Sequence, residues 1–527
     1  MISLDVAIYN ASVYTMNPRC PQAQAVGIKG NRILCVGNNE EIKRLCSNST
    51  KRIDAHEQVL LPAFIDAHTH FRLMGVRMDN YLDLTSVGSK QELFLRLKEF
   101  AESKEQSHWV IGTGWDESKW SGDRTFMTRE EIDETIPCQP VALERVDCHL
   151  YCVNSQALEV LDLDPSVRGF ETEGGEPTGR LFEDATVYVR QASTPNQEQI
   201  ISGIQNATVT AYQHGVTSIH QMVVEEGEFR DDLKAYQKLW RNDQLGVRVR
   251  LYFTPNYLDE IITLGLASGF GDSNLQVGGL KLFSDGSIGA KTAWVTEGYQ
   301  DNPGNKGMRI WNSEELEALI RKAHENDIQL AIHAIGTQAL SQVLGCLEVV
   351  LQDDPRPYLR HRIEHSEMPT KNQIQRMKKL QVIASMQPNF TGEWGLPGGM
   401  YVERFGRKRI ETMNPLRWIL DQGIPVAFGS DCMPFGPLYG IHWAINAPFE
   451  NQRFSVEEAI RAYTLGGAFA GNIEQQLGSI EPGKLADLIL LDGDPFLEPA
   501  RIKDMAVGMT IFDGRVVWQA DSELGNT

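Results

Sequence analysis

The sequence lacks a long apolar run and a basic segment near its start. No apolar stretch approaches the roughly 20 residues that a membrane-spanning helix needs. The first residues, MISLDVAIYNASVYTM, carry Asp5 and no basic region before an apolar core. We therefore expect a cytoplasmic protein that has no membrane partner.

Cysteine pairs and positive charge are also scarce. The eight cysteines are scattered without a CxxC pair, which argues against a zinc ribbon and a dense disulfide framework. The 50 basic residues are outnumbered by 70 acidic residues, and the net charge is -20. Because nucleic acid requires a basic face, we expect no nucleic-acid partner.

Both ends of the chain have the pattern of short strands separated by turns. AVGIKGNRILCVG alternates apolar and polar residues around a predicted hairpin turn at Lys29-Gly30-Asn31. KLADLILLDGDP and MAVGMTIFDGRVVW repeat the pattern near the other end. We expect residues 1–60 and 476–527 to complete one small β-sandwich.

Residues 61–475 predict an α/β fold with alternating strands and helices. After an opening strand at 60–70, apolar runs rich in β-branched residues recur at 215–222, 248–253, 277–285, 329–335, 360–366, 382–388 and 424–431. Helical patterns separate most of them, and Ser313 is a candidate helix N-cap. Eight parallel strands with intervening helices predict a (β/α)8 TIM barrel, whose chemistry lies at the carboxyl ends of the strands.

One interval breaks this rhythm. About 145 residues separate the first two barrel strands, whereas a βα unit needs roughly 30. We interpret residues 85–200, approximately, as an inserted subdomain or lid over the barrel mouth, where substrate selection is commonly built.

Polar residues follow the predicted strands at the end where a barrel places its active site. They are His68, His70, His333, His365 and Asp431, with Lys281 inside the fourth strand. Four imidazoles and a carboxylate suit zinc or a similar divalent ion, but they are too many for one catalytic zinc and few for two. A carbamate formed from the Lys281 amine would supply a bridging carboxylate.

Other side chains are candidates for substrate contact. His220, at the end of the second strand, is a candidate for carbonyl polarisation or substrate binding. Glu144, Arg145, His149 and Trp115 lie in the insertion. Trp115, Trp120, Tyr151 and the loop TGEWGLPGGM could form an apolar cover, which would favour a substrate with an apolar or aromatic group.

Taken together, these motifs resemble the amidohydrolase superfamily. GxGWDxxxW, LERVDCHLYCVNSQAL, GLKLFSDGSIGAKTA, HAIG, RIEH, GSD and GSIEPGKLADLILLDGDPF further resemble its subgroup that includes N-substituted formamide deformylase. The resemblance implies a binuclear site: His68, His70 and Asp431 hold one metal, His333 and His365 the other, and carboxylated Lys281 bridges them. Thr337, Gln221 and Lys291 depart from the subgroup's common residues, which affects the expected substrate contacts.

The resemblance implies a metal-dependent hydrolase of a non-peptide carbon–nitrogen bond in an N-substituted amide, formamide or carbamate. A metal-activated hydroxide would attack, with Asp431 as base and then acid and Lys281 as the catalytic bridge. The two ions would be Zn²⁺, with Mn²⁺, Fe²⁺ or Co²⁺ as alternatives. Hydrolysis of a lactone or other ester, deamination of a heterocycle, and a non-catalytic regulatory role are the rival functions. A homodimer is expected on base rates.

Overall fold

The computed structural model describes residues 3–103, 109–117, 120–145, 150–182, 184–223 and 228–520. The chain divides into two compact units. Unit 1 comprises Met1–Phe71 and Thr208–Thr527, and unit 2 comprises Arg72–Ala207.

Unit 1 contains the predicted barrel of eight parallel strands. In chain order these are β8 (Phe64–Thr69), β15 (Val216–Met222), β16 (Arg248–Phe253), β17 (Leu275–Phe283), β18 (Leu330–Ala334), β19 (Arg362–His365), β20 (Ile383–Met386) and β21 (Val426–Phe428). Each strand pairs in parallel with the next, in the spatial order β21-β20-β19-β18-β17-β16-β15-β8. The fold prediction is confirmed.

The first and last strands meet beyond their paired residues, so the barrel is nearly closed. The Asp431 amide donates to the His68 carbonyl at 2.8 Å. Gly429 makes this approach feasible, because a Cβ atom at this position would lie 2.4 Å from the His68 nitrogen. A side chain at 429 would therefore push β21 away from β8.

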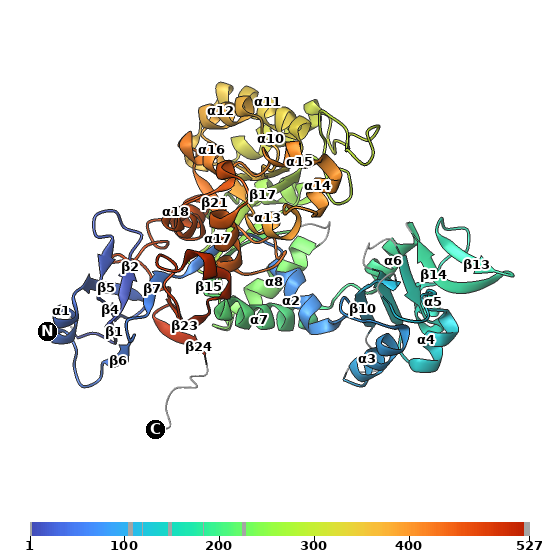
Figure 1. Cartoon of the computed structure of the whole chain (residues 1–527), viewed down its shortest axis with the longest axis horizontal. Helices are drawn as coiled ribbons and strands as arrows, with labels where there is room; N and C mark the ends of the chain where they lie inside the picture. Colours follow the sequence, from blue (N-terminus) through green and yellow to red (C-terminus); the bar gives the residue numbers. More distant parts are fainter. Residues whose placement is uncertain are drawn as a thin grey trace. The chain divides into compact units, whose positions relative to one another are not determined.

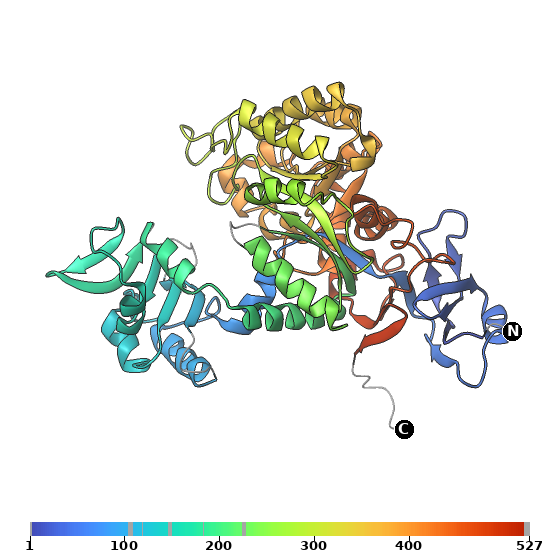
Figure 2. The same cartoon turned by 180° about the vertical axis from the view of Figure 1, so that it is seen from behind.

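Helices cover the outside of the barrel. Figures 1 and 2 show helices α10, α11 and α12 outside the strands. The main covering helices include α8 (Glu228–Arg241), α10 (Ser313–Glu325), α11 (Thr337–Asp353), α12 (Lys371–Leu380), α16 (Leu416–Asp421) and α17 (Pro437–Asn446). Ser313 is not the N-cap of α10: Asn312 caps it by accepting from the Glu315 amide, and the Glu315 side chain accepts from the Asn312 amide in return.

The two ends of the chain build the predicted sandwich from two sheets. The first contains β1 (Val6–Tyr9), β4 (Ala25–Lys29), β5 (Arg32–Gly37) and β6 (Lys51–Asp54). The second contains β2 (Ser12–Tyr14), β3 (Gln22–Ala23), β7 (Val59–Pro62), β22 (Leu488–Leu491), β23 (Val507–Phe512) and β24 (Arg515–Gln519).

Pairing of β7 with β22 joins the N-terminal and C-terminal segments directly. Buried apolar side chains of both segments, including Ile28 and Leu488, share one core. The hairpin expected at residues 29–31 is present between β4 and β5, where Gly30 has a φ of 59° that a glycine adopts without strain.

Unit 2 has its own six-stranded sheet. Its strands are β9 (Tyr81–Asp83), β10 (Val110–Trp115), β11 (Val141–Arg145), β12 (Leu150–Val153), β13 (Phe170–Glu173) and β14 (Glu176–Phe182). Helices α3 (Lys90–Glu102), α4 (Arg129–Thr135), α5 (Ser155–Leu161) and α6 (Asp184–Ala192) accompany the sheet. The unit has two apolar clusters of its own, as an independently packed insertion would. Its role as a lid stays a prediction.

None of the helices in the described parts of the chain is long and apolar enough to cross a membrane.

Candidate metal centre

The structure brings together all six residues that the sequence predicted as metal ligands. The potential ligand atoms of His68, His365 and Asp431 all lie within 4.8 Å of one another. The ring centroids of His333 and His365 are 4.5 Å apart. His70 Nε2 lies 2.9 Å from Asp431 Oδ1, and Lys281 Nζ lies 3.3 Å from His68 Nε2.

Hydrogen bonds fix which nitrogen of three rings carries the proton. His68 Nδ1 faces Glu364 Oε2 at 2.5 Å, His70 Nδ1 faces the Met222 carbonyl at 2.9 Å, and His333 Nε2 faces the Gly286 carbonyl at 3.1 Å. Because these oxygens only accept, the facing nitrogens carry the protons. In the neutral form of each ring the opposite nitrogen has a lone pair, as metal binding requires.

Burial keeps the imidazoles neutral. Burial, followed by neighbouring positive charges including Lys281, places the pKa values of His68, His333 and His365 well below the ordinary value. The buried Nδ1 of His365 has no hydrogen-bond partner. These rings therefore offer bare nitrogen atoms at neutral pH.

Asp431 supplies the carboxylate of the cluster. Burial favours its protonated form, but interactions with His70, His68 and Lys281 outweigh burial and hold the Asp431 pKa below its ordinary value. Its Oδ1 is buried and lies 2.9 Å from Nε2 of His70. A carboxylate oxygen and an imidazole nitrogen at this distance can both bind one cation, so the side chains suit a divalent metal.

Lys281 lies fully buried within β17, two residues before the end of the strand. Burial lowers the pKa of its amine to about 8, while the carboxylates of Glu364 and Asp431 oppose this shift. The lowered pKa gives Lys281 a larger share of neutral amine near neutral pH than an exposed lysine has, and the neutral amine is the form that reacts with carbon dioxide.

Two of the metal-ligand residues have unusual backbone conformations. His365 and Asp431 have φ values of 69° and 54°, in the left-handed region that residues with a Cβ rarely occupy. Asp66 helps to hold this end of the barrel, since its Oδ1 accepts from the amides of His68 and Ser430 at 3.1 and 2.9 Å. The strand ends are thus tied together where the ligands emerge.

Two charged residues beside the cluster were missed by the sequence reasoning. Arg362 Nε and Nη2 donate to Glu364 at 2.5 and 2.9 Å, and Glu364 contacts His68. Both residues are fully buried. The signal was present in the motif RIEH, because residues two apart on a strand share a face, so Arg362 and Glu364 both face the barrel interior.

His220 is inside the barrel but its contacts are with Arg362 and not with the metal-ligand cluster. Its Nδ1 accepts from Arg362 Nη1 at 2.7 Å, and its ring packs near Tyr252. A Cβ on Gly471 would lie 2.8 Å from His220 Nε2, which shows how closely the backbone packs against the ring. These contacts favour a role in holding Arg362 over one in contacting substrate.

The residues predicted in the insertion lie in unit 2. Trp115 is fully buried there, donates from Nε1 to the Leu143 carbonyl at 2.9 Å and packs against Trp120. This is a core position, not a surface that a substrate could reach within the unit. His149 lies outside the described residues.

Glu144 and Arg145 have structural partners within unit 2. Glu144 accepts from the Tyr151 hydroxyl at 2.6 Å. Arg145 pairs with Glu117 through two hydrogen bonds of 2.9 Å. Their roles in substrate binding stay predictions.

The three departures from the subgroup pattern lie in different elements: Gln221 in β15, Lys291 between β17 and α10, and Thr337 at the start of α11. Gln221 reaches Asp232 on α8 at 3.4 Å, so it faces the outside of the barrel. Lys291 pairs with Asp301 at 2.9 Å, and the Thr337 hydroxyl lies 2.9 Å from that of Thr296.

Aromatic residues of unit 1 stand next to the metal ligands. The half-buried Phe283 at the end of β17 lies 5.2 Å from the His333 ring, centroid to centroid, and 4.8 Å from Lys281 Nζ. Phe390 stacks parallel to His365, and Trp394 packs against Phe390. Phe390 and Trp394 belong to α13 (Asn389–Trp394), which overlaps the glycine-rich loop predicted as a cover.

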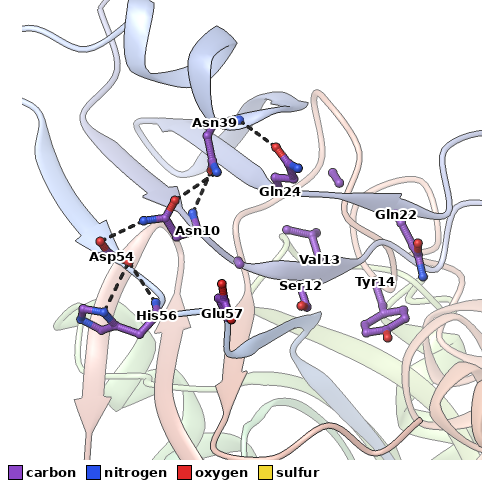
Figure 3. A pocket seen from close by; sticks show the side chains of 12 residues that line it. Asn10, Ser12, Val13, Tyr14, Gln22, Gln24, Asn39, Asp54, His56 and Glu57 are labelled. Carbon is purple, nitrogen blue, oxygen red and sulfur yellow. Dashed lines mark hydrogen bonds and ion pairs between the residues drawn. The ribbon is translucent and has the colours of Figure 1, made fainter. Parts of the chain in front are cut away.

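A polar hollow of about 820 Å³ lies elsewhere, where the chain crosses between the sandwich sheets. Figure 3 shows hydrogen bonds among the side chains that line it. The Asn10 side chain donates to Asp54 at 3.0 Å and accepts from Asn39 at 3.0 Å. It contains none of the metal-ligand residues.

Most of the sequence matches a known family. Residues 51–518 match the family model described as "Amidohydrolase family". The chain belongs to this family. The resemblance inferred from the motifs is confirmed, and members of the family are metal-dependent hydrolases.

Relatives of this amidohydrolase family member match over nearly their whole length. The protein named "Putative amidohydrolase YtcJ" from Bacillus subtilis (strain 168) is 29% identical, with 96% of this chain and 98% of the relative covered. The N-substituted formamide deformylase of Arthrobacter pascens is 26% identical, with 97% of each covered.

A crystal structure of an uncharacterized metal-dependent hydrolase from Pyrococcus furiosus is 30% identical and has a TM-score of 0.81, with 93% of this chain and 99% of that chain covered. Together with the family match, these relatives identify the chain as a metal-dependent hydrolase of carbon–nitrogen bonds other than peptide bonds, which acts on a small molecule.

Proposed function

We propose that this amidohydrolase cleaves an N-substituted amide, formamide or carbamate that carries an apolar or aromatic group. The observation that carries the proposal is the meeting of His68, His70 and His333, each with one bare nitrogen, beside the charged Asp431 carboxylate. This donor set supports binding of divalent cations, with zinc as our first choice.

In the proposed site, His68, His70 and Asp431 would hold one ion, and His333 and His365 would hold a second. Lys281, carboxylated on its amine, would serve as a ligand of both. The ions supply Lewis-acid chemistry, because they lower the pKa of water and polarise a carbonyl group.

The proton transfers fall to Asp431. Its low pKa keeps the carboxylate ionised, so it can accept a proton from the attacking water. As the water oxygen bonds to the carbonyl carbon and the carbon–nitrogen bond breaks, Asp431 returns that proton to the leaving nitrogen. The products are a carboxylic acid, or the acid derived from a carbamate, and an amine.

The half-buried Phe283 and the stacked Phe390 support the apolar part of the substrate. Their rings adjoin the ligands His333 and His365, so a group attached near the scissile bond would meet aromatic surface. The name of the Arthrobacter pascens relative places N-substituted formamides first among the compounds to be tested.

The test is a panel of N-substituted formamides, other N-acyl amines, carbamates and cyclic amides, assayed with zinc and bicarbonate. We expect an amine and an acid from at least one compound. Release of ammonia alone would indicate deamination, and turnover of lactones but of no amide would indicate ester hydrolysis; either result would contradict the proposal.

The metal arrangement is tested by metal content. We expect about two zinc ions per wild-type chain, as a two-metal site requires, and loss of metal and activity in Lys281→Ala. Full metal content and activity in Lys281→Ala would contradict the bridged site. The cytoplasmic location and the homodimer stay predictions.

A further inference from the structure

A buried carboxylate stands between a metal ligand and a buried arginine. Glu364 Oε2 lies 2.5 Å from His68 Nδ1, and both Glu364 oxygens accept from Arg362, at 2.5 and 2.9 Å. Glu364 and Arg362 are both fully buried. The carboxylate is therefore hydrogen-bonded on both oxygens inside the barrel.

Arg362 forms further hydrogen bonds besides those to Glu364. Its Nη2 also donates to the Ser385 hydroxyl at 2.7 Å and to the Ala67 carbonyl, and its Nη1 donates to His220 Nδ1 at 2.7 Å. The partners come from four different barrel strands, β8, β15, β19 and β20. The guanidinium can therefore tilt only if several hydrogen bonds break together.

Stability alone does not account for this arrangement. Desolvating two charges costs free energy that their attraction often fails to repay, so well-packed apolar residues would serve the core at least as well. What a carboxylate provides that apolar residues do not is an acceptor that fixes the tautomer of His68 and increases the basicity of its other nitrogen.

We propose that Glu364 and Arg362 are positioning residues of the metal centre. Glu364 holds His68 with its proton on Nδ1 and its Nε2 lone pair toward Asp431 and Lys281. Arg362, supported by Ser385 and His220, keeps Glu364 aimed at that ring. The inference rests on the proposed function only in treating His68 as a metal ligand.

The principal variant is Glu364→Gln, which keeps the shape of the side chain and removes its charge. Its amide could also donate to His68 Nδ1, which would move the ring proton to Nε2 and block that nitrogen. Because partners of ligating histidines typically contribute 10- to 100-fold to metal affinity, we expect a zinc dissociation constant raised by about that factor.

The chain offers a matched control in Asp487→Asn. Arg248 and Asp487 form a second buried pair, with two hydrogen bonds of 2.9 Å and side chains that are 0% and 2% exposed. This pair joins the barrel to the sandwich, and Arg248 also donates to Asn274 and Asp513, neither of which is a metal-ligand residue. We expect Asp487→Asn to lower the unfolding temperature while zinc affinity stays within about threefold, a small fraction of the 10- to 100-fold effect.

Zinc affinity is measured by competition with a chromophoric chelator, and the unfolding temperature is measured on zinc-free protein. Should Glu364→Gln fail to fold, Ser385→Ala gives the same comparison, since it removes one hydrogen bond from Arg362 and should weaken zinc binding less. Wild-type zinc affinity in folded Glu364→Gln, or in Ser385→Ala where only that variant folds, would overturn the proposal.

The readout also separates the two proposals. If the wild type hydrolyses no amide in the panel while Glu364→Gln still loses zinc, the proposed substrate class fails and the positioning role stands. If amides are hydrolysed and Glu364→Gln binds zinc normally, the positioning role fails and the proposed function stands.

Discussion

His70 Nε2 and Asp431 Oδ1 lie 2.9 Å apart, while Nδ1 of the same ring faces the Met222 carbonyl. Because the Met222 carbonyl engages the Nδ1 proton, a neutral His70 ring would direct a lone pair at Asp431. A bound cation satisfies both atoms, whereas the metal-free site must accept the repulsion or take up a proton.

Metal removal should therefore destabilise the protein. We expect a lower unfolding temperature after chelation, and recovery on addition of zinc, because a ligand that binds only the folded state at 100 times its dissociation constant stabilises it by about 2.7 kcal/mol. Differential scanning fluorimetry measures the shift. An unchanged unfolding temperature after complete removal of zinc would contradict this prediction.

Asp431→Asn should remove the proton carrier while preserving the side-chain shape. Because a positioned acid or base contributes 10²- to 10⁴-fold to rate, we expect kcat to fall by about that factor. The assay uses the best amide found in the panel, and circular dichroism checks the fold. A kcat within tenfold of the wild type would exclude Asp431 as the essential base.

Gly429→Ala should separate the two ends of the barrel sheet. The added Cβ would lie 2.4 Å from the His68 backbone nitrogen, and backbone cannot move aside as a flexible side chain can. We expect weaker zinc binding and lower activity. Gly345→Ala in α11 is the control, since its Cβ meets only the end of Arg376 at 3.9 Å; equal losses in both variants would count against the explanation.

His361 should make stability depend on pH. It accepts from the Leu330 amide at Nδ1, and its Nε2 faces Nδ1 of His324, whose Nε2 bonds to the Asp354 carbonyl. Burial, followed by the His324 charge, lowers the His361 pKa from 6.5 to about 3. The unfolded chain therefore binds the extra proton first, and stability from this group is present above pH 6.5 and is lost as pH falls toward 3.

The measurement is urea unfolding in chelator at several pH values between 7 and 4. The unfolding free energy should fall less steeply with decreasing pH in His361→Gln than in the wild type. The two slopes should differ by up to about 1.4 kcal/mol per pH unit for one proton. Identical slopes in wild type and His361→Gln would refute the prediction.

Phe283→Ala should reduce the preference for apolar substrates. Because burial of an aromatic ring contributes about 1.5–3 kcal/mol, we expect kcat/KM for aryl amides to fall roughly 10- to 100-fold more than for N-methylformamide. Phe270→Ala is the control, because that ring is 62% exposed on the loop before β17. Equal losses for both substrate sizes would indicate that Phe283 supports the site without contacting the apolar group.

The sequence by itself determined the barrel, the sandwich strands and the six clustered side chains. Period-two and period-3.6 patterns identify strands and helices locally, and parallel strands of a barrel present their carboxyl ends at one face. Residues as distant as His68 and Asp431 were therefore predictable neighbours, since each follows an apolar strand. The Ser313 cap was wrong by one residue because Asn312 and Ser313 are both good caps, and only the backbone conformation selects one.

Only the tertiary structure determined which polar groups form hydrogen bonds to the metal-ligand residues. The pairing of Glu364 with His68 joins residues that are 296 positions apart, and no local pattern specifies it. A tryptophan such as Trp115 can line a pocket or fill a core, and the sequence does not distinguish the two. The packing of unit 2 places Trp115 in its core. His220 follows as good a strand as the ligands do, but the buried Arg362 takes its Nδ1. Local periodicity encodes the strands, whereas the choice among buried partners depends on distances that exist only once the barrel has closed.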